Sequence, residues 1–132
     1  MSSIRAALAL TVLTAAGLAS MSALGAELTP GQRDAAAHVY TGVAQCEQGQ
    51  QVALTPMAGQ EGHFRLEYKK VSYDVVPEVT TTGAVRLEDK KAGIVWIQIP
   101  AKSMLLNSKQ GHRMVDDCLQ SEQRADRVAA TR

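Results

Sequence analysis

Apolar and polar residues alternate along much of the central chain. The clearest stretch is 62–68, where Phe64 and Leu66 are separated by polar or charged neighbours. Successive side chains of a strand point to opposite faces, so this pattern predicts a half-buried antiparallel strand. A partner strand is expected over 71–76, and we expect Pro77 to end it.

The richest run of strand signals lies between 82 and 107. Apolar and charged residues first alternate, a charged loop follows at 89–93, and β-branched residues then surround Trp96, the only tryptophan. Pro100 separates a third strand from the second. Because β-branched and aromatic runs between Gly and Pro breakers are strand signals, we expect three consecutive strands here.

Shorter strands are expected on both sides of this region. Segments 43–46 and 51–55 precede it, 112–119 follows it, and turn residues separate them. The chain therefore contains about eight short strands at near-regular spacing, which is typical of an antiparallel barrel or a sandwich. We expect an all-β fold in one small domain.

Helical signals lie near the two ends of the chain. Thr29 can serve as N-cap, with Pro30 at the first helical position and Gln32 at the third, which predicts a short helix to about His38. The tail is rich in Ala, Arg, Gln and Asp, and we expect it to be a frayed helix or disordered. The expected leader, helical lead-in, β domain and flexible tail are 1–26, 27–39, 40–119 and 120–132.

The leader has the pattern of a secretory signal peptide. Arg5 supplies a positive start, 6–18 an apolar core, and 22–26 a small-residue cleavage zone. A membrane span is the alternative, but it needs about 20 apolar residues, and this core is shorter. We therefore expect cleavage and a periplasmic protein with no membrane anchor in the mature chain. No cysteine lies near the cleavage zone, which argues against the lipid anchor of a bacterial lipoprotein.

Two cysteines, Cys46 and Cys118, lie in the exported part. In an exported protein a widely spaced pair predicts a disulfide. A metal or redox pair is the alternative, but the spacing is not CxxC and no set of histidines lies nearby. We expect a structural bridge, and neither a metal nor a cofactor.

The overall charge argues against two classes of partner. The full chain carries 14 Lys and Arg against 13 Asp and Glu, and removal of the leader takes Arg5 away. A neutral domain is not typical of a nucleic-acid or anionic-membrane binder. We interpret the pairs Lys69-Lys70 and Lys90-Lys91 as solvated hairpin tips and not as a binding patch.

Catalytic patterns are missing from the sequence. His38, His63 and His112 lie far apart, the serines have no GxSxG context, and no glycine-rich phosphate loop occurs. The pair Asp116-Asp117 would point to opposite faces of a strand. We expect a binding protein, not an enzyme.

Four short motifs follow one another in a distinctive order. They are a cysteine before a Gly turn at 45–49, G-x-x-R-x-E at 83–88, a strand centred on tryptophan at 95–98, and Asp-Asp-Cys at 116–118. With this order and spacing, the chain over 40–119 resembles the bacterial periplasmic and membrane-bound inhibitors of c-type lysozyme. The resemblance implies an eight-stranded antiparallel barrel in which a disulfide fastens the C-terminal strand.

The resemblance also implies a binding surface. In that family one loop carries Ser-Gly-x-Arg-Tyr and the next carries Trp/Tyr-x-Lys-Gly. The serine and lysine enter the lysozyme cleft and meet the carboxylates that perform acid–base catalysis. Alignment on Arg86 places Gly83 at the serine position, and alignment on Trp96 places Gln98 at the lysine position.

Neighbouring residues can supply the two missing groups. A one-residue bulge would make Thr82-Gly83 the hydroxyl-glycine pair, and Lys102 would supply a cation from just beyond Pro100. For Arg86 the structural alternative is hydrogen bonding to loop carbonyls, and Trp96 is expected in the barrel core. The expected partner-binding residues are Thr82, Gly83, Arg86, Gln98 and Lys102.

Two functions remain as hypotheses. The first is a periplasmic protein that inhibits c-type lysozyme by loop insertion. The second is a barrel of the same fold that binds another envelope partner or a small ligand, because fold does not determine function. Thr82 and Lys102 in contact on one rim would favour the first hypothesis, and burial of both would weaken it.

Overall fold

The computed structural model of this chain describes Gly17 and residues 27–131. The leader expected over 1–26, with its cleavage zone, therefore lies outside the described residues apart from Gly17.

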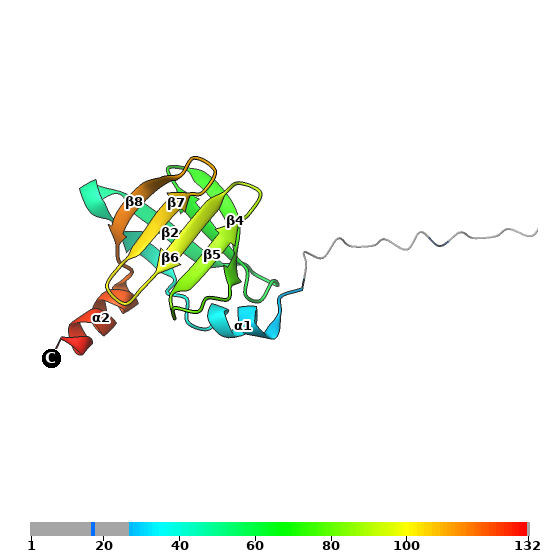
Figure 1. Cartoon of the computed structure of the whole chain (residues 1–132), viewed down its shortest axis with the longest axis horizontal. Helices are drawn as coiled ribbons and strands as arrows, with labels where there is room; N and C mark the ends of the chain where they lie inside the picture. Colours follow the sequence, from blue (N-terminus) through cyan, green and yellow to red (C-terminus); the bar gives the residue numbers. More distant parts are fainter. Residues whose placement is uncertain (1–16, 18–26, 132) are drawn as a thin grey trace, which may run out of the picture.

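Eight antiparallel strands follow one another in a simple meander, each hydrogen-bonded to the next along the chain (Figure 1). The expected all-β class is confirmed. The strands are β1 Gly42–Gln45, β2 Gln51–Pro56, β3 Phe64–Tyr68, β4 Val71–Glu78, β5 Val85–Asp89, β6 Ile94–Gln98, β7 Ser103–Asn107 and β8 His112–Cys118.

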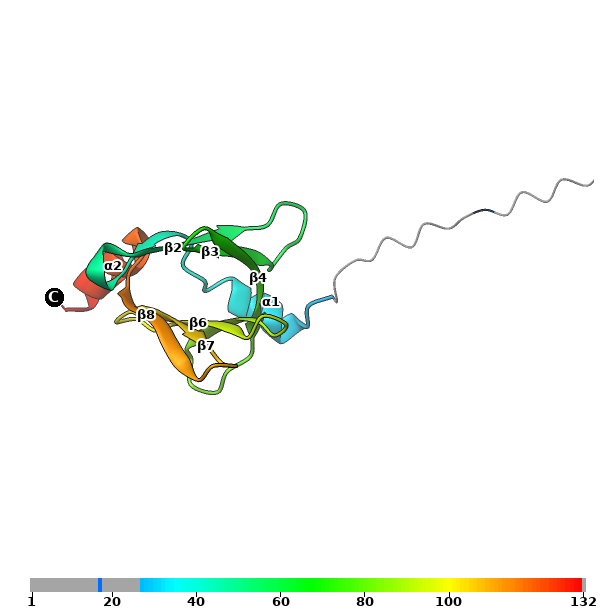
Figure 2. The ribbon, with the colours of Figure 1, turned by 90° about the horizontal axis from the view of Figure 1, so that it is seen from above.

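The sheet curls until its first and last strands meet. Gln45 of β1 bridges Leu119, the residue after β8, through two backbone hydrogen bonds of 3.0 and 2.9 Å. Figure 2 shows β2, β3 and β4 on one side of the interior and β6, β7 and β8 on the other. The fold is thus a nearly closed barrel and not a sandwich, and closure removes the exposed sheet edges that invite aggregation.

The disulfide joins Cys46, which follows β1, to Cys118, the last residue of β8. It lies beside the Gln45–Leu119 bridge, so one covalent bond holds the two strands that close the barrel. The predicted pairing of the two cysteines is confirmed.

The barrel interior is filled by alternate residues of successive strands. The alternation predicted over 62–68 is confirmed, since the β3 residues Phe64, Leu66 and Tyr68 are all buried. Trp96 is fully buried, and on the neighbouring strands it is level with Leu87 and Leu105, both fully buried too. The tryptophan therefore belongs to the core, where alternation along β6 would place it.

Pro77 does not end β4, which continues to Glu78. Val75 is the last residue of β4 that pairs with β3, and from Val76 onward the strand pairs with β5 on its other side. The proline thus lies beyond the end of β3, on a stretch with a free edge. A residue without an N–H is tolerated at such an edge, so the expected break was wrong.

The lead-in forms helix α1, Pro30–Ala36, with the predicted cap. The N–H of Gln32 donates to Thr29 Oγ1 at 3.2 Å, and the N–H of Thr29 donates to Gln32 Oε1 at 2.9 Å. The side chain of Gln32 also donates to the carbonyl of Pro77 at 2.9 Å. A capping residue therefore also fastens the helix to β4.

The tail forms helix α2, Ser121–Ala130, and its beginning is fixed to the barrel. Gln123 is fully buried and donates to the carbonyl of Ile99 at 2.7 Å and to Ser103 Oγ at 3.0 Å. The expectation of a frayed or disordered tail was therefore wrong for the first turn of α2. There the Gln123 side chain forms the hydrogen bonds that water would otherwise make to Ile99 and Ser103. Neither described helix is both long and apolar enough to cross a bilayer.

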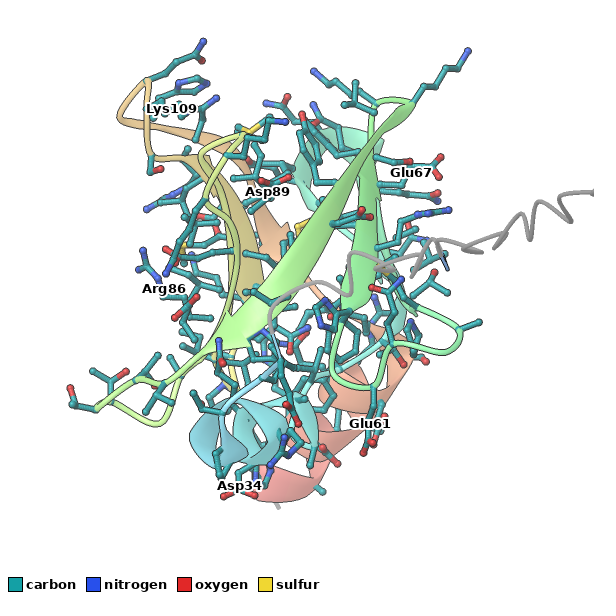
Figure 3. All side chains as sticks on the ribbon, turned by 90° about the vertical axis from the view of Figure 1, so that its right-hand side faces the viewer. Asp34, Glu61, Glu67, Arg86, Asp89 and Lys109 are labelled. Atoms are coloured by element: carbon teal, nitrogen blue, oxygen red, sulfur yellow. A yellow bond between two sulfur atoms is a disulfide. The ribbon has the colours of Figure 1, made fainter. Side chains whose placement is uncertain are left out.

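The meander sorts its connections to two ends of the barrel. We call one the helix end, because α1 and α2 lie there with the connections 57–63, 79–84 and 99–102 (Figure 1). The other, the hairpin end, carries the turns 46–50, 69–70, 90–93 and 108–111. The first of these contains the short helix η1, Glu47–Gly49. In Figure 3, Asp34 and Glu61 mark the helix end and Lys109 the hairpin end.

Candidate partner-binding site

The β4–β5 loop, residues 79–84, projects from the helix end beyond the body of the barrel (Figure 3). Thr82 and Gly83 are both exposed. Gly83 has a φ of +79°, which other residues rarely adopt, and this explains the glycine at that position. Thr80 Oγ1 donates to the carbonyl of Ala84 at 2.7 Å, so the loop is held by its own residues. It presents an accessible hydroxyl, that of Thr82.

Lys102 lies at the end of the tight β6–β7 turn, also at the helix end. Its Nζ is 3.0 Å from Asp116 Oδ2 and 3.4 Å from Asp117 Oδ1, so the expectation that the two carboxylates point to opposite faces was wrong. The positive φ of Asp117, 55°, interrupts the alternation of the strand there. Arg113 also donates to Asp116 Oδ2, at 2.7 Å. The side chain of Lys102 is 32% exposed, so its ammonium group is accessible but already paired.

These contacts shift two pKa values. The hydrogen bond to Asp116 raises the pKa of Lys102 above its ordinary value, against partial desolvation. Burial tends to raise the pKa of Asp116, but the Asp117 N–H and the charges of Lys102 and Arg113 outweigh it and lower that pKa. Asp116 Oδ1 accepts the Asp117 N–H at 2.7 Å. Both shifts favour the charged forms, so the ion pair persists across the neutral range.

Asp116→Asn is expected to flatten the acid side of the stability profile. Because the folded pKa of Asp116 is lowered, its contribution is present above the ordinary value of 3.8 and is lost as the pH falls through the folded pKa. Urea unfolding measured from neutral pH to about pH 2 should show this loss in the parent and less of it in the variant. Asp74→Asn, at an exposed pair 3.9 Å from Arg65, is the control. An equal change in both variants would contradict the assignment.

Thr82 and Lys102 share one end of the barrel but lie on different connections. Thr82 Oγ1 accepts the N–H of Ala84 at 3.4 Å, whereas Lys102 is held by the carboxylates of β8. Neither side chain is buried. The structure therefore brings both groups to the helix end without joining them.

Gln98 is not a surface residue: only 2% of it is exposed. Its Oε1 accepts the N–H of Tyr40 at 2.9 Å, and its Nε2 donates to the carbonyl of Tyr40 at 2.8 Å. The amide thus fastens the segment before β1 to the end of β6. The alternation of Ile94, Trp96 and Gln98 along β6 already placed position 98 on the inner face. That parity was the signal for an interior role.

Arg86 points outward and forms an ion pair with Glu88, with 2.6 Å between Nη2 and Glu88 Oε1. The expected bonds to loop carbonyls are replaced by this pair. Arg86 borders a hollow of 420 Å³ on the outer face of the barrel, whose lining includes Val95, Leu106 and Arg113. We did not expect this hollow, although the unbroken apolar run of β6 puts apolar residues on the outer face as well as the inner one.

Other chemistry is sparse at both ends. Within residues 17 and 27–131, no three His, Cys, Asp or Glu side chains are grouped so as to hold a metal ion. The described site therefore consists of surface groups, chiefly the Thr82 hydroxyl and the Lys102 ammonium, that can donate hydrogen bonds to a partner.

Comparison with known proteins adds no relative. No protein-family model matches the chain, and no curated protein and no solved structure matches it either. The resemblance to inhibitors of c-type lysozyme therefore rests on the motifs and their spacing.

Proposed function

We propose that this chain is an exported binding protein that inhibits c-type lysozyme by inserting the β4–β5 loop into the active-site cleft. The observation that carries the proposal is the projecting loop with exposed Thr82 and Gly83 on a rigid, disulfide-closed barrel. A short loop on a rigid scaffold loses little conformational freedom on binding, which favours affinity.

The chemistry of the helix end suits a cleft that contains two carboxylates. The hydroxyl of Thr82 can donate to one of them, and the ammonium of Lys102 can exchange Asp116 and Asp117 for the other. Glycoside hydrolysis needs one carboxyl to act as acid and the other as base or nucleophile. A donor and a cation held against that pair would block both roles.

A second candidate is favoured by the burial of Gln98 and the pairing of Lys102. In this alternative the barrel binds another envelope partner or a small ligand. The hollow beside Arg86 and Arg113 is then the candidate site, because its apolar floor suits an apolar ligand. A carboxylate on that ligand can take the place of Glu88 or Asp116 at a guanidinium group.

Export is part of the proposal and has its own measurement. Expression of the full sequence in a bacterium, followed by N-terminal sequencing of the periplasmic protein, should show a chain that begins at Ala26 or Glu27. Recovery of the protein in the cytoplasm with an intact leader would contradict export.

Inhibition of hen and human c-type lysozymes by the oxidised protein is the test of function. We expect inhibition at low and at physiological salt, and Thr82→Ala and Lys102→Ala should each weaken it by about tenfold or more, because each removes a hydrogen bond to a charged group. The matched controls are Thr55→Ala, an exposed threonine of β2, and Lys91→Ala at the hairpin end.

Three outcomes of this assay have distinct meanings. Inhibition lost only in the helix-end variants supports loop insertion. Inhibition that is unchanged in them would keep the activity but move the surface. No inhibition at micromolar protein would leave the second candidate, for which Arg86→Ala and ligand capture from an envelope extract come next.

A further inference from the structure

The hairpin end carries a concentration of positive charge that the neutral composition conceals. Its turns contain five lysines and one carboxylate, Glu47, so their net charge is +4. The described terminal segments and connections of the helix end contain four basic and five acidic side chains. Because alternate turns of a meander lie at the same end, the two lysine pairs that we interpreted singly as solvated tips lie at one end of the barrel together with Lys109. The five, here called the lysine rim, are Lys69, Lys70, Lys90, Lys91 and Lys109.

Most of the lysine rim is available to a partner. Lys90 pairs with Glu78 at 3.3 Å, and it is the only rim lysine with a carboxylate partner among the described residues. Lys69 lies over the ring of Tyr68, 5.3 Å from its centroid, and Lys109 donates to the carbonyl of Lys91. All five lysines are exposed. Four of the five ammonium groups thus have no carboxylate partner in the described part of the chain.

Two of these lysines form the β3–β4 turn, in a backbone conformation that favours other residues. Tyr68 pairs with Val71, so Lys69 and Lys70 form a two-residue hairpin loop, and their φ angles are +49° and +64°. Such loops favour Asn-Gly, because a residue with a side chain is strained at positive φ. Strained residues that persist in a fold often serve function. A charged pair at this tip therefore points to a surface that binds an anion-rich partner.

We propose that the lysine rim docks the protein on an anionic lipid bilayer. The lysines belong to three separate turns at one end of the barrel, so a flat anionic surface can approach all three turns together. Each lysine near an anionic membrane surface strengthens binding by about fivefold. Val71, beside the strained turn, is 48% exposed and supplies an apolar side chain at the same surface.

A nucleic acid fits this end less well. Proteins that bind single strands stack bases on exposed aromatic side chains. The aromatic residue nearest the strained turn, Tyr68, is buried, and its hydroxyl bonds the side chain of Gln50. The rim therefore offers charge and an aliphatic contact, which are the requirements of a lipid headgroup surface.

Docking by the hairpin end leaves the helix end free. The two ends are opposite, so the β4–β5 loop would lie at the end remote from the membrane while the rim contacts it. The proposal is independent of lysozyme inhibition, since it uses none of the helix-end groups.

The proposal is tested by co-sedimentation, with vesicles, of the protein purified from the periplasm after expression of the full sequence, with its N-terminus determined. We expect binding to phosphatidylcholine vesicles that contain phosphatidylglycerol, weak binding to phosphatidylcholine alone, and loss of binding as salt is raised. The double variant Lys69→Asn/Lys70→Gly should bind the anionic vesicles about 25-fold more weakly, because it removes two factors of about five. The same variant should melt at a higher temperature than the parent, because Asn-Gly relieves the strained turn.

The control is Arg124→Ala/Arg127→Ala on α2, which also removes two positive charges, but from the helix end. It should leave vesicle binding unchanged. Equal weakening by both double variants would overturn the proposal in favour of a general charge effect. Absence of binding to anionic vesicles would overturn it too, as would preferential binding of soluble polyphosphate or nucleic acid over vesicles.

Discussion

Replacing Cys46 and Cys118 together with alanine is expected to lower the free energy of unfolding by about 4 kcal/mol. The bridge spans 72 residues, so its loss returns a large amount of conformational freedom to the unfolded chain. The folded barrel loses its covalent closure at the same point, beside the Gln45–Leu119 bridge. A domain of this size has a stability of about 5–15 kcal/mol, so we expect a marginal fold.

Denaturant unfolding of the parent and the double variant, with and without reductant, measures this effect. Reductant should lower the midpoint of the parent and leave the variant unchanged. Cα atoms of residues 46 and 118 would remain held near each other by two backbone hydrogen bonds, so a folded but less stable variant is expected. Equal stability of parent and variant would show that the β1–β8 contact needs no covalent support.

Trp96→Ala is expected to lower the free energy of unfolding by about 3–5 kcal/mol. The side chain is fully buried between strands whose facing residues, Leu87 and Leu105, are also fully buried. Leu87 and Leu105 are held on the neighbouring strands, so they cannot fill the cavity left by the indole unless the sheet moves. Because the variant loses its only tryptophan, far-ultraviolet circular dichroism during urea unfolding is the suitable measurement.

Trp96→Phe is the matched variant for this position. The indole Nε1 is buried and forms no hydrogen bond within the described part of the chain. Phenylalanine removes that donor together with some volume, so it should cost clearly less than alanine. A phenylalanine variant as unstable as the alanine variant would indicate that the indole N–H has a partner, such as a bound water.

The local features of the fold were predictable because each depends on a few adjacent residues. Alternation placed Phe64, Leu66 and Tyr68 inside, and the cap at Thr29 began α1. The expected break at Pro77 failed for a non-local reason: β3 has ended where the proline lies, so no ladder hydrogen bond is lost. Whether a proline ends a strand depends on whether a neighbouring strand needs its N–H, which local sequence does not reveal.

The candidate site was predictable in part. The motifs predicted Thr82, Gly83 and Lys102 as partner-binding residues, and the structure places all three on connections at the helix end. The motif alignment put Gln98 on a binding surface, whereas the parity of β6 turns it toward Tyr40. Where a family alignment and strand parity conflict, parity decides, because it follows from the backbone geometry.

The sequence by itself determined the approximate number of strands and which face of β3 is buried, because both follow from local periodicity. It also determined the short capped helix, and the disulfide, since the chain has only two cysteines. Only the tertiary structure decided which groups meet. Pairing of β7 with β8 brought Lys102 to Asp116, contact with the β6–β7 connection buried Gln123 of the tail, and the meander gathered five lysines at the hairpin end. Hydrogen bonds and electrostatic fields act through space, so they depend on the path of the chain and not on its composition.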